Sequence, residues 1–223
     1  KDYAGALKPL QEARALGADG PELRNNLGMA YLGLGQNDRA ATELQEAVRL
    51  KPDWAEATYS LGTAQLRQKQ YERAVETYRK AASLNPNDAN IFTNMGLAQL
   101  ELGKTSEAVE SFRKASTLAP DNADMAINLG MALKRRGDAA GARAAFDQAL
   151  KLNPENYATR VALGEVYASS GETDSAIQHY TAAVTLRPDE FTPHYNLGVI
   201  YSRRGEFAEA AREFGAAVKA EPN

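Results

Sequence analysis

The sequence has no cysteine, only two histidines and one tryptophan among its 223 residues. The absence of cysteine excludes a disulfide framework and any thiolate metal site. Two histidines are too few for a histidine-rich metal site, and no metal-ligand spacing stands out around them. We therefore expect neither a metal nor a cofactor.

Long apolar runs and an excess of positive charge are also missing. No run approaches the ~20 apolar residues that a membrane-spanning helix needs. The 26 Lys and Arg residues oppose 29 Asp and Glu residues, for a net charge of −3. The sequence therefore predicts a soluble segment with no membrane anchor and without the basic field of a nucleic-acid-binding protein. The cytoplasm and the periplasm stay equally open.

Glycine, proline and alanine, by contrast, recur on a period of 34 residues without insertion or deletion. One glycine series lies at positions 28, 62, 96, 130, 164 and 198, and the main proline series at 52, 86, 120, 154, 188 and 222. Because several residue types share one period, the chain is a tandem array.

Repeat position 1 is assigned to Pro21, Ala55, Ala89, Ala123, Tyr157 and Phe191. The array then predicts the second helix of a truncated repeat over 1–20 and six repeats over 21–54, 55–88, 89–122, 123–156, 157–190 and 191–223, all in one solenoid domain. Because the array opens inside a repeat, we expect it to be a piece of a longer protein.

Each repeat is predicted to form two helices. The first spans roughly repeat positions 2 to 14. Repeat position 15 is the turn, usually a glycine that can adopt the left-handed C-cap conformation, with Lys69 as the exception. The second starts at a polar N-cap such as Asn37, Thr105 or Thr173 and ends before the proline at repeat position 32. Small residues at repeat positions 8, 20 and 27 let the helices approach a bulky residue at repeat position 24. The bulky series is Leu44, Tyr78, Phe112, Phe146, Tyr180 and Phe214.

This pattern resembles the tetratricopeptide repeat, and the resemblance covers essentially the whole chain. The fifth repeat matches throughout, with Leu163, Gly164, Tyr167, Ala176, Tyr180, Ala183 and Pro188. Mild departures occur at repeat position 4, often Trp in the family, and at repeat position 11 in the middle repeats. The resemblance implies an all-α fold, a right-handed superhelical solenoid of antiparallel helix pairs.

Catalytic chemistry is not indicated. Residues 98–105 fit a loose phosphate-loop pattern, but that pattern needs a glycine-rich loop between a strand and a helix, and here most of it falls on a predicted helix. His179 is expected on a solvated face, and His194 occupies the family's Trp position. We predict no catalytic residue in this segment, and a catalytic domain outside it stays open.

Candidate binding residues lie on the concave face, which the resemblance assigns to the first helices. Repeat position 6 carries asparagine in four repeats, at Asn26, Asn94, Asn128 and Asn196. A carboxamide donates and accepts, so it can pair with both groups of a peptide unit, whereas asparagine is a poor helix former. The ladder therefore favours binding of an extended polypeptide. The alternative is polar filler on a solvated helix face.

Apolar side chains at repeat positions 5 and 9 would add adaptable contacts, namely Tyr59, Tyr195, Met29 and Met131. Alternatively, such residues pack on adjacent helices. Basic residues end the first helices, at Arg67, Lys134, Arg135, Arg136, Arg203 and Arg204. They form a strip that would attract an acidic segment, although the helix dipole favours cations there anyway.

A chaperone-tail clamp of this family is not supported, because its Lys at repeat position 5, Asn at 9 and Arg at 6 are absent. The asparagine ladder is similar to that of a glycosyltransferase's repeat superhelix. We interpret the chain as a protein-interaction scaffold that binds an extended peptide or partner segment in its groove. One alternative is the substrate-recognition arm of a larger enzyme such as a glycosyltransferase. Another is a self-assembly module that forms homo-oligomers through open end helices near Leu10 or Phe214.

Overall fold

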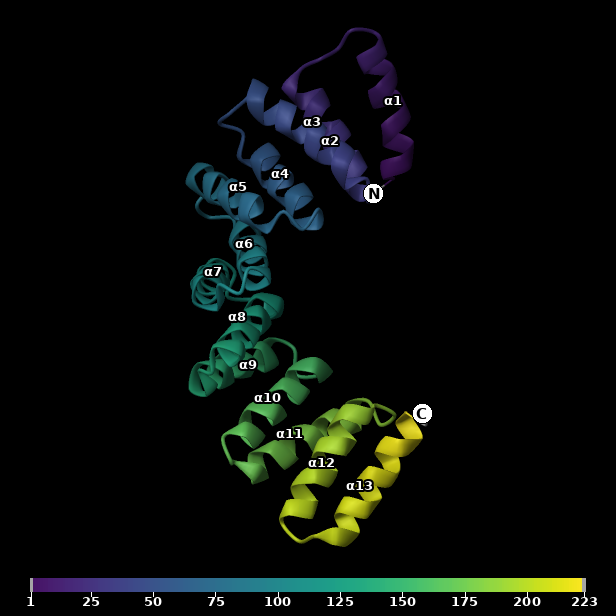
Figure 1. Cartoon of the computed structure of the whole chain (residues 1–223), viewed down its shortest axis with the longest axis vertical. Helices are drawn as coiled ribbons and strands as arrows, with labels where there is room; N and C mark the ends of the chain where they lie inside the picture. The colour runs from purple at the N-terminus through teal and green to yellow at the C-terminus, as the bar shows by residue number, and fades with distance from the viewer. Residues whose placement is uncertain (1, 222–223) are drawn as a thin grey trace. The chain divides into compact units, whose positions relative to one another are not determined.

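The computed structural model describes residues 2–221, which fold into thirteen helices with no strand among them (Figure 1). The helices are α1 (Tyr3–Ala15), α2 (Pro21–Gly33), α3 (Asn37–Leu50), α4 (Ala55–Arg67), α5 (Tyr71–Leu84), α6 (Ala89–Glu101), α7 (Thr105–Leu118), α8 (Ala123–Arg136), α9 (Ala139–Leu152), α10 (Tyr157–Ser169), α11 (Thr173–Leu186), α12 (Phe191–Arg203) and α13 (Phe207–Ala220). The chain divides into two compact units, Lys1–Leu118 with α1 to α7 and Ala119–Asn223 with α8 to α13.

Helical hairpins build both units. Each first helix packs on the second helix of its own repeat, as α2 does on α3 and α8 on α9, and consecutive hairpins stack within a unit (Figure 1). The predicted all-α solenoid of antiparallel helix pairs is confirmed. Its right-handed superhelical path stays a prediction.

Each hairpin turns through a left-handed residue at repeat position 15. Five of these residues are glycines with φ of 72°, 73°, 84°, 78° and 77°, at Gly35, Gly103, Gly137, Gly171 and Gly205. Lys69 takes the same conformation, with φ of 59°. The left-handed residue lets the chain fold back, so that in the first repeat the Gln36 N–H donates to the Tyr31 carbonyl at 2.9 Å.

In α3 and α11 the N-cap residue lies one position earlier than the sequence predicts. Gln36 and Glu172 occupy the N-cap positions of α3 and α11, so Asn37 and Thr173 are the first helical residues. At the other end of α3, Lys51 adopts φ −137° and ψ 82° because the proline that follows it disfavours helical geometry.

The bulky residue at repeat position 24 packs on the glycine at repeat position 8 of the same repeat. A Cβ atom on Gly62 would lie 2.7 Å from Cε1 of Tyr78, which is fully buried. A Cβ atom on Gly130 would lie 2.5 Å from Cε1 of Phe146. Real Cβ atoms do not approach rings this closely, so glycine is what allows the two helices to close on the ring.

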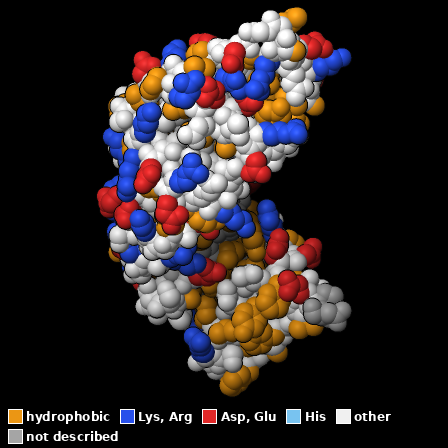
Figure 2. All heavy atoms as spheres, turned by 45° about the horizontal axis from the view of Figure 1, so that its top comes forward, with side chains coloured by type: hydrophobic (Ala, Val, Ile, Leu, Met, Phe, Trp, Pro, Cys, Tyr) orange, Lys and Arg blue, Asp and Glu red, His pale blue; other side chains and the backbone are white. Residues whose placement is uncertain are grey.

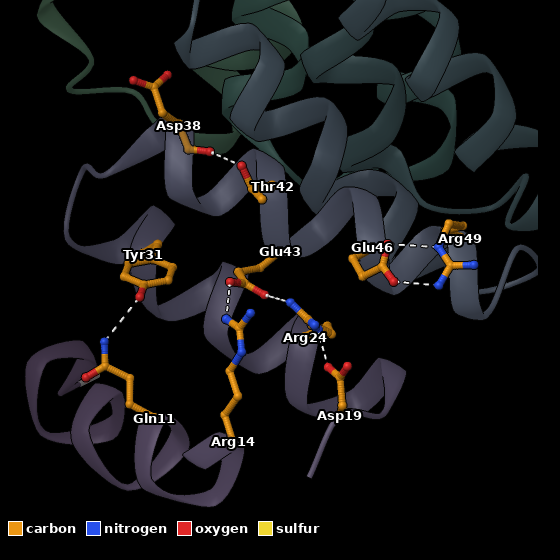
Figure 3. Close-up of polar contacts among 10 residues, drawn as sticks. All are labelled: Gln11, Arg14, Asp19, Arg24, Tyr31, Asp38, Thr42, Glu43, Glu46 and Arg49. Carbon is orange, nitrogen blue, oxygen red and sulfur yellow. Dashed lines mark hydrogen bonds and ion pairs between the residues drawn. The ribbon is translucent and has the colours of Figure 1, made fainter. Parts of the chain in front are cut away.

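Repeat positions 4 and 23 face each other within a hairpin, and in the first repeat they carry a buried ion pair. Nη1 of Arg24 donates to Oε2 of Glu43 at 2.7 Å (Figure 3). Oε1 of Glu43 accepts from Arg14 of α1 at 2.6 Å, and Arg24 also donates to Asp19 at 2.5 Å. The hydrogen bonds that Arg24 donates to Asp19 and then to Glu43 raise the pKa of Arg24 above its usual range. The cluster therefore joins α1, α2 and α3.

The sixth repeat fills the same two positions with His194 and Glu213, both buried. Nε2 of His194 lies 2.9 Å from the Pro188 carbonyl oxygen, which only accepts, so Nε2 donates there. Nδ1 lies 2.7 Å from Oε2 of Glu213. The imidazole is therefore held from both sides.

The fifth repeat is mismatched at these positions, because Arg160 faces His179. Arg160 Nε and His179 Nδ1 are buried and have no hydrogen-bond partner. Burial, followed by the charge of Arg160, lowers the pKa of His179. The prediction of a solvated face for His179 is wrong, since the ring is half-buried and stacks on Tyr167 with centroids 5.3 Å apart.

Candidate functional site

An apolar cleft of about 570 Å³ opens between α1, α2 and the start of α4 in the first unit. This N-terminal cleft is lined by Asp2, Tyr3, Ala6, Pro9, Leu10, Asn25, Asn26, Met29, Ala30 and Glu56. Two predicted site residues, Asn26 and Met29, lie in it. Asn26 is exposed, and Met29 is half-buried with its Sδ accepting a hydrogen bond from Ser60 Oγ at 3.1 Å.

A second cleft, of about 400 Å³, lies on α8, α9, α10 and α12 in the second unit. This C-terminal cleft is lined by Ile127, Met131, Lys134, Phe146, Tyr157, Ala158, Thr159, Val161, Ala162, Glu165, Glu190 and Thr192. The predicted residue Met131 lines it and is 47% exposed. Lys134 and Glu165 form an ion pair at its edge, so its charges are partly balanced.

The two clefts occupy the same register of the repeat. Each uses repeat positions 5 and 9 of one first helix and repeat position 2 of the next. These residues are Asn25, Met29 and Glu56 in the N-terminal cleft, and Ile127, Met131 and Ala158 in the C-terminal cleft. A methionine at repeat position 9 is thus common to both.

The predicted asparagine ladder has different surroundings at each rung. Asn26 lines the N-terminal cleft, whereas Asn94 uses its Nδ2 to donate to the Tyr59 hydroxyl at 3.0 Å inside the first unit. Burial raises the pKa of that tyrosine. Asn128 and Asn196 are half-buried on α8 and α12 and line neither cleft. Of the four asparagines, Asn26 therefore has the strongest structural case.

Tyr195 is 47% exposed but packs within an aromatic group. Its ring stacks on Phe191 with centroids 5.3 Å apart and lies tilted against Phe214 at 6.0 Å. The tyrosine thereby shields part of Phe214, which is half-buried. Packing explains much of its position.

The predicted basic strip is largely occupied by internal contacts. The partners are the Leu32 carbonyl for Arg67, Glu165 for Lys134, Asp138 for Arg136, and Asp174 and Glu206 for Arg204. Arg135 and Arg203 are exposed at the ends of α8 and α12. Pairing within the protein lowers the charge that the strip offers to an acidic segment.

Sequence reasoning missed Asn25. Asn25 is 3% exposed, lines the N-terminal cleft, and its Oδ1 is buried without a hydrogen-bond partner. The available signal was its repeat position 5, where the other repeats carry Tyr, Thr, Ile, Val and Tyr. A buried amide at a position otherwise filled by tyrosine or β-branched residues marks a local departure from the repeat.

The tetratricopeptide repeat family models match residues 25–89, 93–156, 127–191 and 191–223. The chain belongs to the tetratricopeptide repeat family. A comparison with curated protein sequences finds no match.

Solved structures of tetratricopeptide repeat proteins share its fold. A crystal structure of MamA has a TM-score of 0.70 and 26% identity, covering 73% of this chain and 95% of that one. YrrB, described as a tetratricopeptide repeat protein with an unusual peptide-binding site, has a TM-score of 0.72 and 23% identity, covering 82% and 95%. The C-terminal part of a repeat protein from Cytophaga hutchinsonii has a TM-score of 0.86 and 15% identity, covering 100% and 92%. The family and these neighbours support a protein-interaction scaffold.

Several other site types find no support in the part of the chain that the structure describes. Its residues include no group of three or more His, Asp or Glu side chains placed to hold a metal ion. Residues 98–105 lie on α6, its turn and the start of α7, not on a loop between strand and helix. None of the helices over residues 2–221 has the length and apolarity to cross a bilayer.

Proposed function

We propose that this tetratricopeptide repeat chain binds an extended segment of a partner protein along its first helices. The observation that carries the proposal is the shared register of the two clefts, each with a methionine at repeat position 9. Methionine is unbranched and polarisable, so Met29 and Met131 suit ligand side chains of varied shape. Asn26 adds a donor and an acceptor for main chain beside the first cleft.

Binding of this kind is expected to be weak. Burying one apolar side chain of the ligand contributes about 1.5–3 kcal/mol, and each net hydrogen bond about 1 kcal/mol. Ordering of an extended segment offsets part of this gain. One apolar anchor and a few backbone contacts in either cleft therefore support a transient complex, which avidity would strengthen.

The test selects binding peptides from a random display library and measures their affinity by fluorescence anisotropy. Met29→Ala should weaken peptides that bind the N-terminal cleft about tenfold, and Met131→Ala should do the same to peptides that bind the C-terminal cleft, because each removes about 1.4 kcal/mol of apolar contact. Met125→Leu is the matched control, since Met125 is 7% exposed and lines neither cleft. Unchanged affinity in both alanine variants with an intact helical spectrum would contradict the proposal.

Asn26→Ala tests the main-chain contact separately. It should lower the affinity about fivefold, whereas Asn94→Ala should act mainly on stability because its amide serves Tyr59. A larger loss of affinity in Asn94→Ala than in Asn26→Ala would show that the ligand does not bind beside Asn26.

Self-association is a second candidate, and the exposed apolar face of α13 favours it. Phe207 is 71% and Val218 is 63% exposed. Figure 2 shows apolar side chains gathered beside the C-terminal end of the chain. Sedimentation equilibrium of the wild type and of Phe207→Glu should then give a higher mass for the wild type. Equal single-chain masses across concentrations would exclude this candidate.

A further inference from the structure

The N-terminal cleft combines an apolar floor with oxygen acceptors and no cationic side chain. Tyr3, Leu10 and Met29 supply apolar surface, while Asp2, Asn25 and Glu56 supply oxygens. No Lys or Arg is among the residues that line it. We propose that this cleft selects a partner segment in which a lysine or arginine adjoins an apolar residue. The inference rests on the proposed function, because it specifies the ligand of that groove.

Asn25 is the first observation behind this selectivity. Asn25 is only 3% exposed, yet its Oδ1 accepts no hydrogen bond. Buried acceptors of this kind are normally paired, so an unpaired one calls for an explanation. Lys and Arg side chains carry several N–H donors and no acceptor. Rotation of the Asn25 amide toward the cleft that it lines would let a bound cationic side chain supply the missing donor.

Glu56 is the second, independent observation. It is exposed in the first turn of α4 and forms no ion pair among the described residues. Glu22 holds the same repeat position in α2, but it lies 3.9 Å from Lys51 Nζ. The helix dipole favours an acid at both places. Of these two glutamates, Glu56 is the one that lines a cleft and has an unpaired carboxylate.

Asp2 is a further acidic residue at the mouth of the cleft. Its Oδ1 accepts a hydrogen bond from the Gly5 N–H at 2.8 Å. The C-terminal cleft differs, because Lys134 and Glu165 pair at its edge. Selection for a cation is therefore expected in the first cleft and not in the second.

Methionine methyl NMR reads both clefts at once, since the chain has four methionines. Met29 and Met131 report on the clefts, and Met95 and Met125, which are 9% and 7% exposed, report on the core. The probes are three acetylated and amidated glycine–serine peptides that differ in one dipeptide, Leu-Lys, Leu-Gln or Leu-Glu. The Leu-Lys peptide should shift the Met29 methyl with an affinity about fivefold above that of Leu-Gln, and Leu-Glu should bind most weakly.

The preference should be electrostatic. It should shrink in Glu56→Gln, persist in the matched control Glu22→Gln, and vanish at about 1 M salt, where the screening length is about 3 Å. Asn25→Val copies Val161 of the fifth repeat and should raise the unfolding temperature while weakening Leu-Lys binding. A gain in stability with unchanged affinity would overturn the role of Asn25.

Failure of this inference and failure of the proposed function look different. Equal affinities of Leu-Lys and Leu-Glu peptides at Met29 would overturn the selectivity alone and leave the groove standing. Silent Met29 and Met131 methyls with all three peptides, including at millimolar concentration, would count against the proposed function itself.

Discussion

Replacing Glu43 with alanine should destabilise the first hairpin far more than an exposed ion pair would suggest. Glu43 is 7% exposed, and its two carboxylate oxygens bind Arg14 at 2.6 Å and Arg24 at 2.7 Å (Figure 3). The Arg24 side chain is only 13% exposed. Removing the carboxylate therefore leaves a largely buried guanidinium with half of its partners.

The expected loss of stability depends on which contacts Arg24 and Arg14 keep once the carboxylate is gone. Breaking a buried ion pair by removing one member costs about 3–5 kcal/mol. Arg24 keeps its 2.5 Å contact with Asp19, and the Arg14 side chain is 45% exposed and returns to water. These two recoveries reduce the expected loss to about 2–3 kcal/mol.

Hydrogen exchange measures this loss best, because repeat arrays do not always unfold in one step. Protection of the slowest amides in α2 and α3 should fall about 30- to 150-fold, the equivalent of that free energy. Glu46→Ala is the matched control on the same helix. Its pair with Arg49 lies at 2.6 Å but the arginine is 67% exposed, so the expected loss is below about 1 kcal/mol. Equal losses in the two variants, or a less than twofold effect of Glu43→Ala, would refute the reasoning.

Four further substitutions are each checked by the urea midpoint of the circular dichroism signal. His179→Glu should stabilise by about 1 kcal/mol, because it gives Arg160 the partner that the first repeat has, and a lower midpoint would contradict this. Gly62→Ala should destabilise by about 1 kcal/mol, since its Cβ would lie 2.7 Å from a buried ring, whereas Gly215→Ala, which meets nothing within 4 Å, should stabilise by about 0.5–1 kcal/mol. Lys69→Gly should gain about 0.5 kcal/mol by relieving the left-handed strain, and a loss would mean that its side chain matters more than its backbone.

The fold was predictable from sequence because it depends on residues that repeat. A glycine like Gly62 and a bulky residue like Tyr78 recur at the same spacing in every repeat. In each hairpin the glycine lets the two helices pack closely around the bulky side chain. The left-handed glycine turns follow from the same regularity. Periodic positions therefore suffice to specify helices, turns and the stacking of hairpins.

The candidate site was only partly predictable, because it depends on contacts that differ between repeats. Met29 and Met131 were found through their shared repeat position, and both line clefts. Asn94 shares its register with Asn26 yet serves Tyr59 internally, which the period cannot show. The solvated face expected for His179 failed for the same reason, since Arg160 and an aromatic neighbour determine its surroundings.

Residues that depart from the repeat pattern are therefore the best candidates for a role in function rather than in folding. A tandem array supplies its own controls, because the backbone at a given repeat position is nearly the same in every copy. Val161 shows that repeat position 5 accepts an apolar residue, so the unpaired Oδ1 of Asn25 is not required by the fold. Its energetic penalty is about 1–3 kcal/mol in the free protein. A penalty that the fifth repeat avoids, at the wall of a cleft with a free carboxylate, is best explained by a ligand that removes it.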